Sequence, residues 1–491
     1  MSSPILHIHA NYTLIEGTYD PDIVDKACRF RKSGYRHSTA YKNRVWDGYT
    51  RLFRRAKNAF PTGLKDRVLK VYKKSYPNIR FVIEDHREFK SSKQVPKIQD
   101  IELNGVTLRK HQIRAGNDML KKKHGVLWAS TNSGKTEVAI ALIKALDEPA
   151  LFLVKGKDLV FQTHERFKTR LGEEDIGIIT SSKWDVRKFT IASADTLARR
   201  FNPSKVTKNS GGRKKQVEEL LTSMKVVIID ECHTLASDGL FSIVRYCTAP
   251  YRYGLSGTPF KRGDKQDLKL IALTGEVCCK ITNKEMIEDG VSVPTDIMFV
   301  DIDTPKLPVG IDYQTAYDDG IVYNTYRNNI ICEAAIEFYK KKKQVLIIVK
   351  KIDHGHALSD LIAATKKFVP HQFIHGSIPT EERVEALENF KNGITKILIA
   401  SSILDQGVDI PNINVLIFAS GGNSYIRAIQ RVGRGLRLHD NKERLIVVDF
   451  SDRTNKYLAK HSIERFKTYA SEHCFTIDIV DGVGDLVGVH N

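Results

Sequence analysis

The stretch GVLWASTNSGKTEVAI, residues 125–140, decides the fold of the region around it. An apolar strand leads into a loop of small and polar residues, and a helical pattern follows at once, as in the strand–loop–helix units of parallel α/β sheets. Small side chains let successive backbone N–H groups point at a phosphate, and the helix N-terminus adds its dipole. Lys135 can reach the β- and γ-phosphates of a nucleotide, and the Thr136 hydroxyl can coordinate Mg²⁺. The residues predicted to bind the nucleotide here are Ala129, Ser130, Thr131, Asn132, Ser133, Gly134, Lys135 and Thr136.

A second motif, KVVIIDECH at residues 225–233, ends a buried strand in a pair of carboxylates. The carboxyl end of a parallel strand, beside a phosphate-binding loop, is where the Mg²⁺ partner must lie. Asp230 therefore suits the metal, and Glu231 suits orienting and deprotonating an attacking water. Alternatively, an acidic pair ending a strand could cap a helix. The sequence favours ATP as the nucleotide and Mg²⁺ as the cofactor, with Lys135, Asp230 and Glu231 as catalytic residues.

The strand–helix rhythm around these motifs occurs twice. Short apolar runs alternate with helical stretches at 100–290 and again at 295–450, which predicts two consecutive parallel α/β units. A small basic segment with short alternating strands precedes them, and a polar stretch at 87–100 is a plausible linker. The tail after residue 450 offers one long helical pattern and a short strand. A basic insertion at 202–216 reads as a solvated loop or as a loop that contacts nucleic acid.

These motifs resemble those of the superfamily 2 helicases. ASTNSGKT, DECH and LSGTP (255–259) match motifs I, II and III in order and spacing, with DECH as a DExH box and Ala129 where the usual loop has glycine. The resemblance implies a coupling role for His233, Ser256 and Thr258, and an adenine-reading role for Gln112 in the segment LRKHQ. It also places Lys155 in a motif that contacts the nucleic-acid strand.

The second unit carries the remaining motifs of that family. ILIASSILDQGVDIP (397–411) resembles motif V, although Ser401-Ser402 stands where the family often has Thr-Asp. AIQRVGRGLR (428–437) resembles motif VI. The resemblance implies that ATP lies between two RecA-like domains, that Arg434 and Arg437 act as arginine fingers, and that Asp409 lies near the ribose. The residues carried over from the second unit are Gly407 and Asp409 for the nucleotide, and Gln430, Arg434 and Arg437 for catalysis.

Composition limits the class of protein and its partners. The formal net charge is +19, and residues 1–100 hold 21 Lys/Arg against 10 Asp/Glu, which favours a polyanionic partner bound at the front of the chain. Seven cysteines without a CxxC pair disfavour a structural zinc site and a disulfide framework. The sequence has neither a signal peptide nor a long apolar run, so we expect a cytoplasmic protein with no membrane contact, in the host cytoplasm if a phage encodes it. We also expect a monomer.

The segment RVWDGYTRLFRR, residues 44–55, bears on the choice of polymer. Residues 29–57 hold ten Lys/Arg and six aromatics, a combination that suits phosphates and unpaired bases. Trp46 and Phe53 are equally well explained as core residues of a small domain, with Asp47-Gly48 as a hairpin turn. The arginines predicted to contact phosphates are Arg44, Arg51, Arg54 and Arg55.

The chain as a whole resembles the phage UvsW-type branch-migration helicases. The resemblance rests on the basic front domain, a two-domain motor without large insertions, the segment EMIEDGVSVP (285–294) and the helical tail. That resemblance implies an ATP-dependent DNA helicase that acts on forks or Holliday junctions in replication, recombination or repair. A DExH-type RNA helicase and a duplex DNA translocase without strand separation are the alternatives. The expected layout is a basic α+β DNA-binding domain, two tandem RecA-like parallel-sheet domains and a helical C-terminal extension, at 1–98, 99–292, 293–450 and 451–491.

Overall fold

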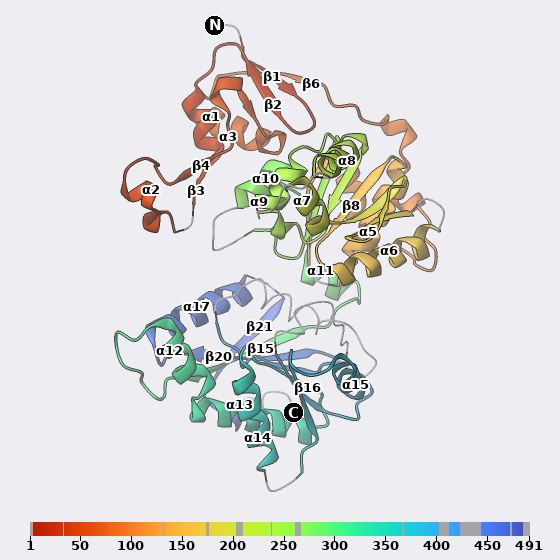
Figure 1. Ribbon diagram of the computed structural model, residues 1–491. Helices are drawn as coiled ribbons and strands as arrows, with labels where there is room; N and C mark the ends of the chain where they lie inside the picture. Colours follow the sequence, from red (N-terminus) through yellow and green to blue (C-terminus); the bar gives the residue numbers. More distant parts are fainter. Residues whose placement is uncertain are drawn as a thin grey trace. The chain divides into compact units, whose positions relative to one another are not determined.

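The computed structural model consists of two compact units, Met1–Ile281 and Thr282–Asn491. Each unit is organised around its own parallel sheet, as Figure 1 shows. The predicted α/β class with two parallel-sheet domains behind a small α+β domain is therefore confirmed. The structure describes residues 3–32, 34–130, 132–172, 176–202, 210–236, 238–260, 267–365, 368–401, 412–422, 443–471 and 474–484.

The front of the first unit is a small α+β module. Its four-stranded sheet has the order β5-β2-β1-β6, in which β2 runs antiparallel to β1 and β6 runs parallel to it. Helices α1 and α3 bury Val24, Val68 and Tyr72 in a core with Leu6 and Ile15. The elements are β1 (Ile5–Ile8), β2 (Thr13–Glu16), α1 (Pro21–Ala27), β3 (Arg29–Arg31), α2 (Thr39–Lys42), β4 (Tyr49–Arg51), β5 (Ala59–Phe60), α3 (Lys65–Ser75) and β6 (Val82–Asp85).

The predicted hairpin at Asp47-Gly48 is wrong. Strands β3 and β4 do pair antiparallel, but residues 32–48 join them, and the Asp47 carboxylate accepts a hydrogen bond from the Tyr49 N–H at 3.1 Å in a local turn before β4. Phe53 is a core residue, as predicted. Trp46 is half-buried outside that core, and its ring Nε1–H donates to the Tyr49 carbonyl at 2.8 Å.

The rest of the first unit is an eight-stranded sheet with the order β10-β9-β11-β8-β12-β13-β7-β14. All neighbours run parallel except the edge pair β9–β10. Strands β8, β12 and β13 are buried along their whole length, as a sheet covered by helices requires. The strands are β7 (His124–Ala129), β8 (Ala150–Val154), β9 (Ile176–Ile179), β10 (Trp184–Asp185), β11 (Phe189–Ser193), β12 (Val226–Ile229), β13 (Tyr251–Ser256) and β14 (Val277–Ile281), and the helices are α4 (Lys110–Lys122), α5 (Lys135–Leu146), α6 (Lys157–Leu171), α7 (Ala194–Phe201), α8 (Ser210–Ser223), α9 (Asp238–Val244) and α10 (Asp267–Thr274).

The segment predicted to be a linker lies against the first sheet. Phe89 packs edge-on against Tyr251 with ring centroids 5.1 Å apart, and the Lys90 ammonium donates to the Leu146 carbonyl at 2.9 Å. Ile98 is fully buried against α4, so closely that a Cβ added at Gly116 would lie 2.8 Å from it. The stretch therefore anchors the front module to the sheet.

The second unit has a wholly parallel seven-stranded sheet with the order β17-β18-β16-β19-β20-β15-β21. The tail after residue 450 belongs to it, because β21 pairs with β15 and α17 packs on β20. The strands are β15 (Thr295–Ile302), β16 (Val345–Ile348), β17 (His371–Ile374), β18 (Ile397–Ala400), β19 (Val415–Ile417), β20 (Leu445–Asp452) and β21 (Phe475–Val480), and the helices are α11 (Asn283–Glu288), α12 (Tyr313–Tyr317), α13 (Thr325–Lys340), α14 (Ile352–Ala363), α15 (Thr380–Lys391) and α17 (Lys456–Ala470).

Buried ion pairs fix these last elements. The Arg465 Nε on α17 lies 3.0 Å from the Asp449 carboxylate on β20, and the Tyr469 hydroxyl donates to the same carboxylate at 2.9 Å. The Arg327 Nε on α13 lies 2.8 Å from Asp452. Because removing one partner of a buried pair strands the other charge, this network ties the tail to the sheet.

Candidate nucleotide site and basic surface

The loop between β7 and α5 forms a compact cradle. Gly134 caps α5 with φ +73°, and a Cβ added there would lie 2.1 Å from Nε2 of Gln112, so the position requires glycine on two grounds. The Lys135 ammonium donates back to the carbonyls of Ala129 and Ser130 at 3.3 and 3.5 Å. A cationic side chain over a helix N-terminus is the arrangement that phosphates need. Thr131 lies outside the described residues, while Asn132 and Thr136 are partly exposed.

Gln112 supports the loop from behind. Its amide Nε2 donates to the Ser133 carbonyl at 3.1 Å, and its Oε1 accepts from the Arg109 N–H at 2.9 Å. The neighbouring His111 Nε2 lies 3.2 Å from the same carbonyl. His111 is a residue that the motif pattern did not identify, although it lies within the segment LRKHQ. Both side chains are buried, so they fix the carbonyl side of the loop.

The acidic pair follows β12. The Asp230 carboxylate accepts a hydrogen bond from the Glu231 N–H at 2.9 Å, and Glu231 adopts φ +44°, a left-handed conformation that is strained for a non-glycine residue. Desolvation raises the pKa of Asp230 to about 6, the charge of Glu231 adds to the rise, and Lys135 opposes it. Desolvation also acts to raise the pKa of Glu231, but the hydrogen bond with His233 and the charge of Lys135 outweigh it and leave that pKa lowered.

The three predicted coupling residues form a chain of contacts with Glu231. Nδ1 of His233 lies 3.1 Å from Glu231 Oε2 and 3.1 Å from Ser256 Oγ. Ser256 Oγ in turn accepts a hydrogen bond from the Thr258 N–H at 3.1 Å. Side-chain contacts therefore connect the carboxylate pair to the backbone that follows β13.

Sheet topology explains why motifs a hundred residues apart meet. Strands β12, β13 and β7 are parallel neighbours, so the loops that follow them leave the sheet at the same edge. Those three loops carry Asp230 and Glu231, Ser256 and Thr258, and the cradle, respectively. Lys155 follows β8, the next strand along, and is exposed. The predicted residues of the second unit, Gly407, Asp409, Gln430, Arg434 and Arg437, lie outside the described residues.

Comparison with known protein families matches both units. The profile described as "Type III restriction enzyme, res subunit" matches residues 105–261, and the profile described as "Helicase conserved C-terminal domain" matches residues 327–439. The chain is 28% identical over 280 residues to the ATP-dependent DNA helicase uvsW of Enterobacteria phage T4, a match that covers 52% of this chain and 55% of uvsW. This chain is a superfamily 2 helicase.

Two further similarities extend over more of the helicase. It is 24% identical over 425 residues to the DNA 3'-5' translocase XPB2 of Sulfurisphaera tokodaii, covering 76% of this chain and 90% of that protein. Among solved structures, the ATP-dependent Type ISP restriction-modification enzyme LlaBIII bound to DNA matches with a TM-score of 0.56 at 13% identity, over 78% of this chain and 32% of that one. The latter similarity supports the fold alone. Within the described residues, no helix of the helicase combines the length and the apolar character that a bilayer span requires.

The arginines of the front module differ in how they are held. Arg51 forms ion pairs with Asp47 and with the buried Asp25, at 3.3 Å for the latter, and it lowers the pKa of Asp47 to about 2. Arg55 is paired with Asp22. Arg44 is exposed, with φ +58°. The charges of Arg51 and Arg55 are thus partly neutralised within the protein.

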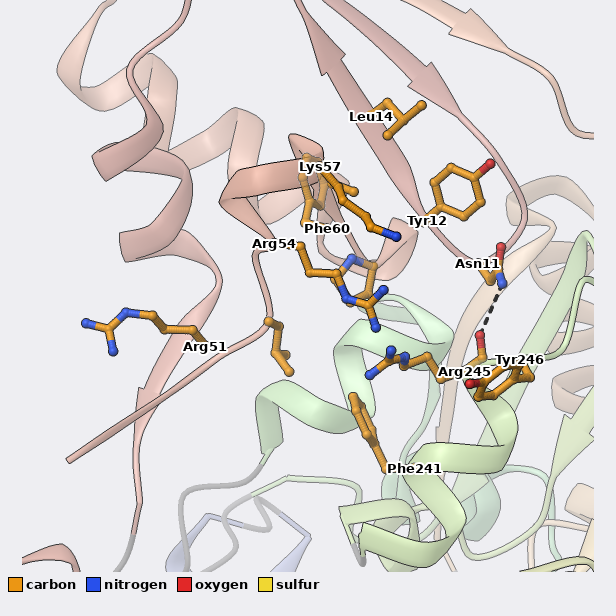
Figure 2. A pocket seen from close by; sticks show the side chains of 13 residues that line it. Asn11, Tyr12, Leu14, Arg51, Arg54, Lys57, Phe60, Phe241, Arg245 and Tyr246 are labelled. Carbon is orange, nitrogen blue, oxygen red and sulfur yellow. Dashed lines mark hydrogen bonds between the residues drawn. The ribbon is translucent and has the colours of Figure 1, made fainter. Parts of the chain in front are cut away.

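Arg54 lines a pocket of about 520 Å³ between the front module and α9. Figure 2 shows Arg54, Lys57 and Arg245 directing their charged ends into the same space, while Arg51 points away. The Asn11 amide closes one side by donating to the Arg245 carbonyl at 3.1 Å. None of the residues that line the pocket is acidic. The lining residues are Asn11, Tyr12, Leu14, Arg51, Leu52, Arg54, Lys57, Ala59, Phe60, Pro61, Phe241, Arg245 and Tyr246.

Proposed function

We propose that this ATP-dependent helicase acts on branched DNA and binds a DNA strand across the basic pocket between its front module and its first motor domain. The observation that carries the proposal is the convergence of Arg54, Lys57 and Arg245 in a pocket without an acidic side chain. Like charges gathered in one space repel one another unless an anion joins them, and the phosphodiester backbone is an anion of the right spacing and chemistry.

Aromatic side chains favour an unpaired strand in that pocket. Tyr12 and Tyr246 expose 41% and 47% of their surface at its edge. One side of each ring packs inside the protein, Tyr12 against His9 and Tyr246 against Phe201, so stacking on a base would use the exposed side. A junction or fork offers unpaired nucleotides beside duplex, and sequence-tolerant stacking on aromatics is how such nucleotides are held. The DNA-directed names of uvsW and of the XPB2 translocase agree with this polymer.

We further propose that the cradle binds ATP with Mg²⁺. The residues fit that ligand, because Gly134 leaves room at the helix start, Lys135 offers its ammonium, and Thr136 and Asp230 offer oxygen ligands. Mg²⁺ held there would neutralise phosphate charge. Glu231 would orient and deprotonate the attacking water, and its contact with His233 would pass the state of the site to Ser256.

The roles proposed for the second unit follow the family pattern. Gln430, Arg434 and Arg437 would complete the catalytic set, and Gly407 and Asp409 would contact the nucleotide. The two arginines would supply positive charge to the transferring phosphoryl group, where one arginine finger can contribute roughly 10³–10⁵ in rate.

ATPase stimulation across nucleic acids tests the proposed polymer. Hydrolysis is measured with single-stranded DNA, duplex DNA, forked DNA, four-way junctions and RNA at equal nucleotide concentration, beside strand displacement on the same substrates. We expect the greatest stimulation, and displacement, with forks or four-way junctions. Stronger stimulation by RNA would replace the proposal with an RNA helicase, and stimulation by duplex without displacement would replace it with a duplex translocase.

A further inference from the structure

Four polar side chains gather on the outer face of the front module's sheet. His7 on β1 stands opposite Glu84 on β6 in the strand register, and it alternates with the buried Leu6 and Ile8. Glu16 on β2 pairs with Ile5, two residues before His7, and so shares the outer face. His86 follows Glu84 by two residues, and its backbone N–H donates to the Ile8 carbonyl at 2.9 Å. Strands β1, β2 and β6 lie side by side at the top of Figure 1.

Three ligand atoms of this cluster lie within 3.8 Å of one another. Nδ1 of His7 lies 3.2 Å from Nε2 of His86 and 3.1 Å from Oε2 of Glu84, and the latter two atoms are 3.8 Å apart. A tetrahedral zinc ion with bonds of 2.0–2.1 Å separates its ligands by about 3.3 Å. The triangle therefore has the size of one face of a zinc coordination tetrahedron.

Glu16 orients the ring of His7. Its carboxylate lies 2.8 Å from Nε2 of His7, so in a neutral imidazole this nitrogen is the donor and Nδ1 is left as the ligand atom. Nδ1 then faces both the Glu84 carboxylate, at 3.1 Å, and Nε2 of His86, at 3.2 Å, so a cation at this point would meet all three ligand atoms. A carboxylate behind a ligating histidine is also the usual outer support of a metal site.

We propose that His7, Glu84 and His86 bind one zinc ion, with Glu16 as the positioning residue behind His7 and a water in the fourth position. Two imidazoles and one carboxylate suit zinc and other late first-row metals rather than Mg²⁺ or Ca²⁺, which prefer oxygen ligands. The sequence-based expectation of no structural zinc rested on cysteine spacing. His7 lies 77 residues before Glu84 and 79 before His86, and it meets them through the β1–β6 pairing.

The zinc ion would join β1 to β6 at the point where the chain leaves the module. Strand β6 is exposed along its length, with Val82 and Ile83 at 47% and 50% of their surface, so few side chains hold it to the sheet. Two residues beyond His86, Glu88 pairs with Lys225 of the first motor domain at 3.3 Å, and Phe89 then packs on Tyr251. Zinc binding would thus stabilise the junction between the front module and the motor.

Metal titration of the untagged full-length chain tests the site. After chelation and dialysis, we expect calorimetry to show one equivalent of Zn²⁺ bound, and Co²⁺ to give the intense visible bands of a four-coordinate ion. His86→Ala should lower Zn²⁺ affinity at least ~100-fold. His37→Ala, which removes an exposed histidine of the same module outside the cluster, should bind as the wild type does. Absence of tight Zn²⁺ binding by the wild-type chain, or unchanged binding by His86→Ala, overturns the proposal.

Glu16→Gln separates a positioning role from simple loss of charge. The amide can still contact Nε2 of His7 but no longer draws the proton there, so we expect one zinc equivalent with about 10–100-fold weaker affinity. Hydrogen exchange gives a second readout, since amides of residues 82–86 should gain protection on adding Zn²⁺ to the wild type and none in His86→Ala. If His7 instead bridges Glu16 and Glu84 as an imidazolium, Zn²⁺ changes neither readout. ATPase activity without nucleic acid serves as the folding control, because a variant that keeps the wild-type rate has a folded motor.

Discussion

The nucleotide cradle and the basic pocket are both assembled from distant residues, but their charged groups are held in opposite ways. At the nucleotide site, Lys135 of the cradle contacts loop carbonyls, and Glu231 after β12 contacts His233. In the pocket, Arg54, Lys57 and Arg245 share one space without an acidic neighbour among the lining residues. Charged groups that contact other protein groups can exchange those contacts for a ligand. Cations without an acidic neighbour attract a polyanion instead. The comparison predicts that mutations in one site leave the other's function intact.

Lys135→Ala should show the largest difference between the effect on ATP hydrolysis and the effect on DNA binding. Removing the side chain that we propose meets the β- and γ-phosphates from the cradle should lower ATP hydrolysis by at least about 100-fold, in line with the loss of one preorganised charge at a reacting group. Affinity for forked DNA, measured by fluorescence anisotropy without nucleotide, should change less than twofold. Retained hydrolysis would show that the cradle is not the ATP site.

The converse change is the double substitution Arg54→Ala with Arg245→Ala. Each lost phosphate contact should reduce the slope of log affinity against log salt by about 0.9, so affinity for a fork at low salt should fall roughly ten- to a hundredfold. Hydrolysis in the absence of nucleic acid should stay as in the wild type. Anisotropy titrations at several salt concentrations measure the slope.

Lys73→Ala is the matched control for that pair, since it removes an exposed cation of α3 outside the pocket. It should leave the salt slope nearly unchanged. An equal loss in Lys73→Ala and in the double variant would mean that the module binds DNA through its overall charge, and the pocket would lose its special role.

The sequence was sufficient for the fold of the motor and for the cradle, for a physical reason. Glycine at φ +73°, a lysine at a helix start and carboxylates after a buried strand are each demanded by local geometry, and parallel topology brings the loops together. Gln112 and His111 show the limit. The adenine-reading role of Gln112 stays a prediction, and His111, which the motif does not single out, shares with Gln112 the contact with the Ser133 carbonyl.

The basic surface could not be worked out from sequence in the same way. Four arginines between residues 44 and 55 look alike in the sequence, but Arg51 and Arg55 are paired with acids from α1, and Arg54 faces a pocket completed by Arg245. Arg245 lies nearly 200 residues further along the chain. No local sequence pattern indicates which arginine is paired with an acid from another element. Only the three-dimensional structure separates the paired arginines from the one that faces the pocket.

A smaller effect is expected from a substitution in the contacts proposed to couple ATP hydrolysis to DNA binding. His233→Ala removes the contact that links Glu231 to Ser256 Oγ. The loss of one hydrogen bond to a charged group corresponds to about 1.5–3 kcal/mol, so hydrolysis with forked DNA should fall at least tenfold. DNA affinity should not change, and the ratio of DNA-stimulated to basal hydrolysis should fall. An unchanged ratio would mean that coupling does not pass through this histidine.

The smallest change in DNA binding is expected from Arg51→Ala. Its guanidinium is engaged with Asp47 and with the buried Asp25, so it has little free charge to offer a phosphate. Affinity for forked DNA should fall by less than about threefold, well short of the effect of Arg54→Ala. The free energy of unfolding should instead fall by about 1 kcal/mol, because Asp25 keeps only Arg29, at 3.1 Å, as its partner. Chemical denaturation beside anisotropy measures both quantities. If Arg51→Ala weakened DNA binding as much as Arg54→Ala, ion pairing within the module would not decide which arginines reach the DNA.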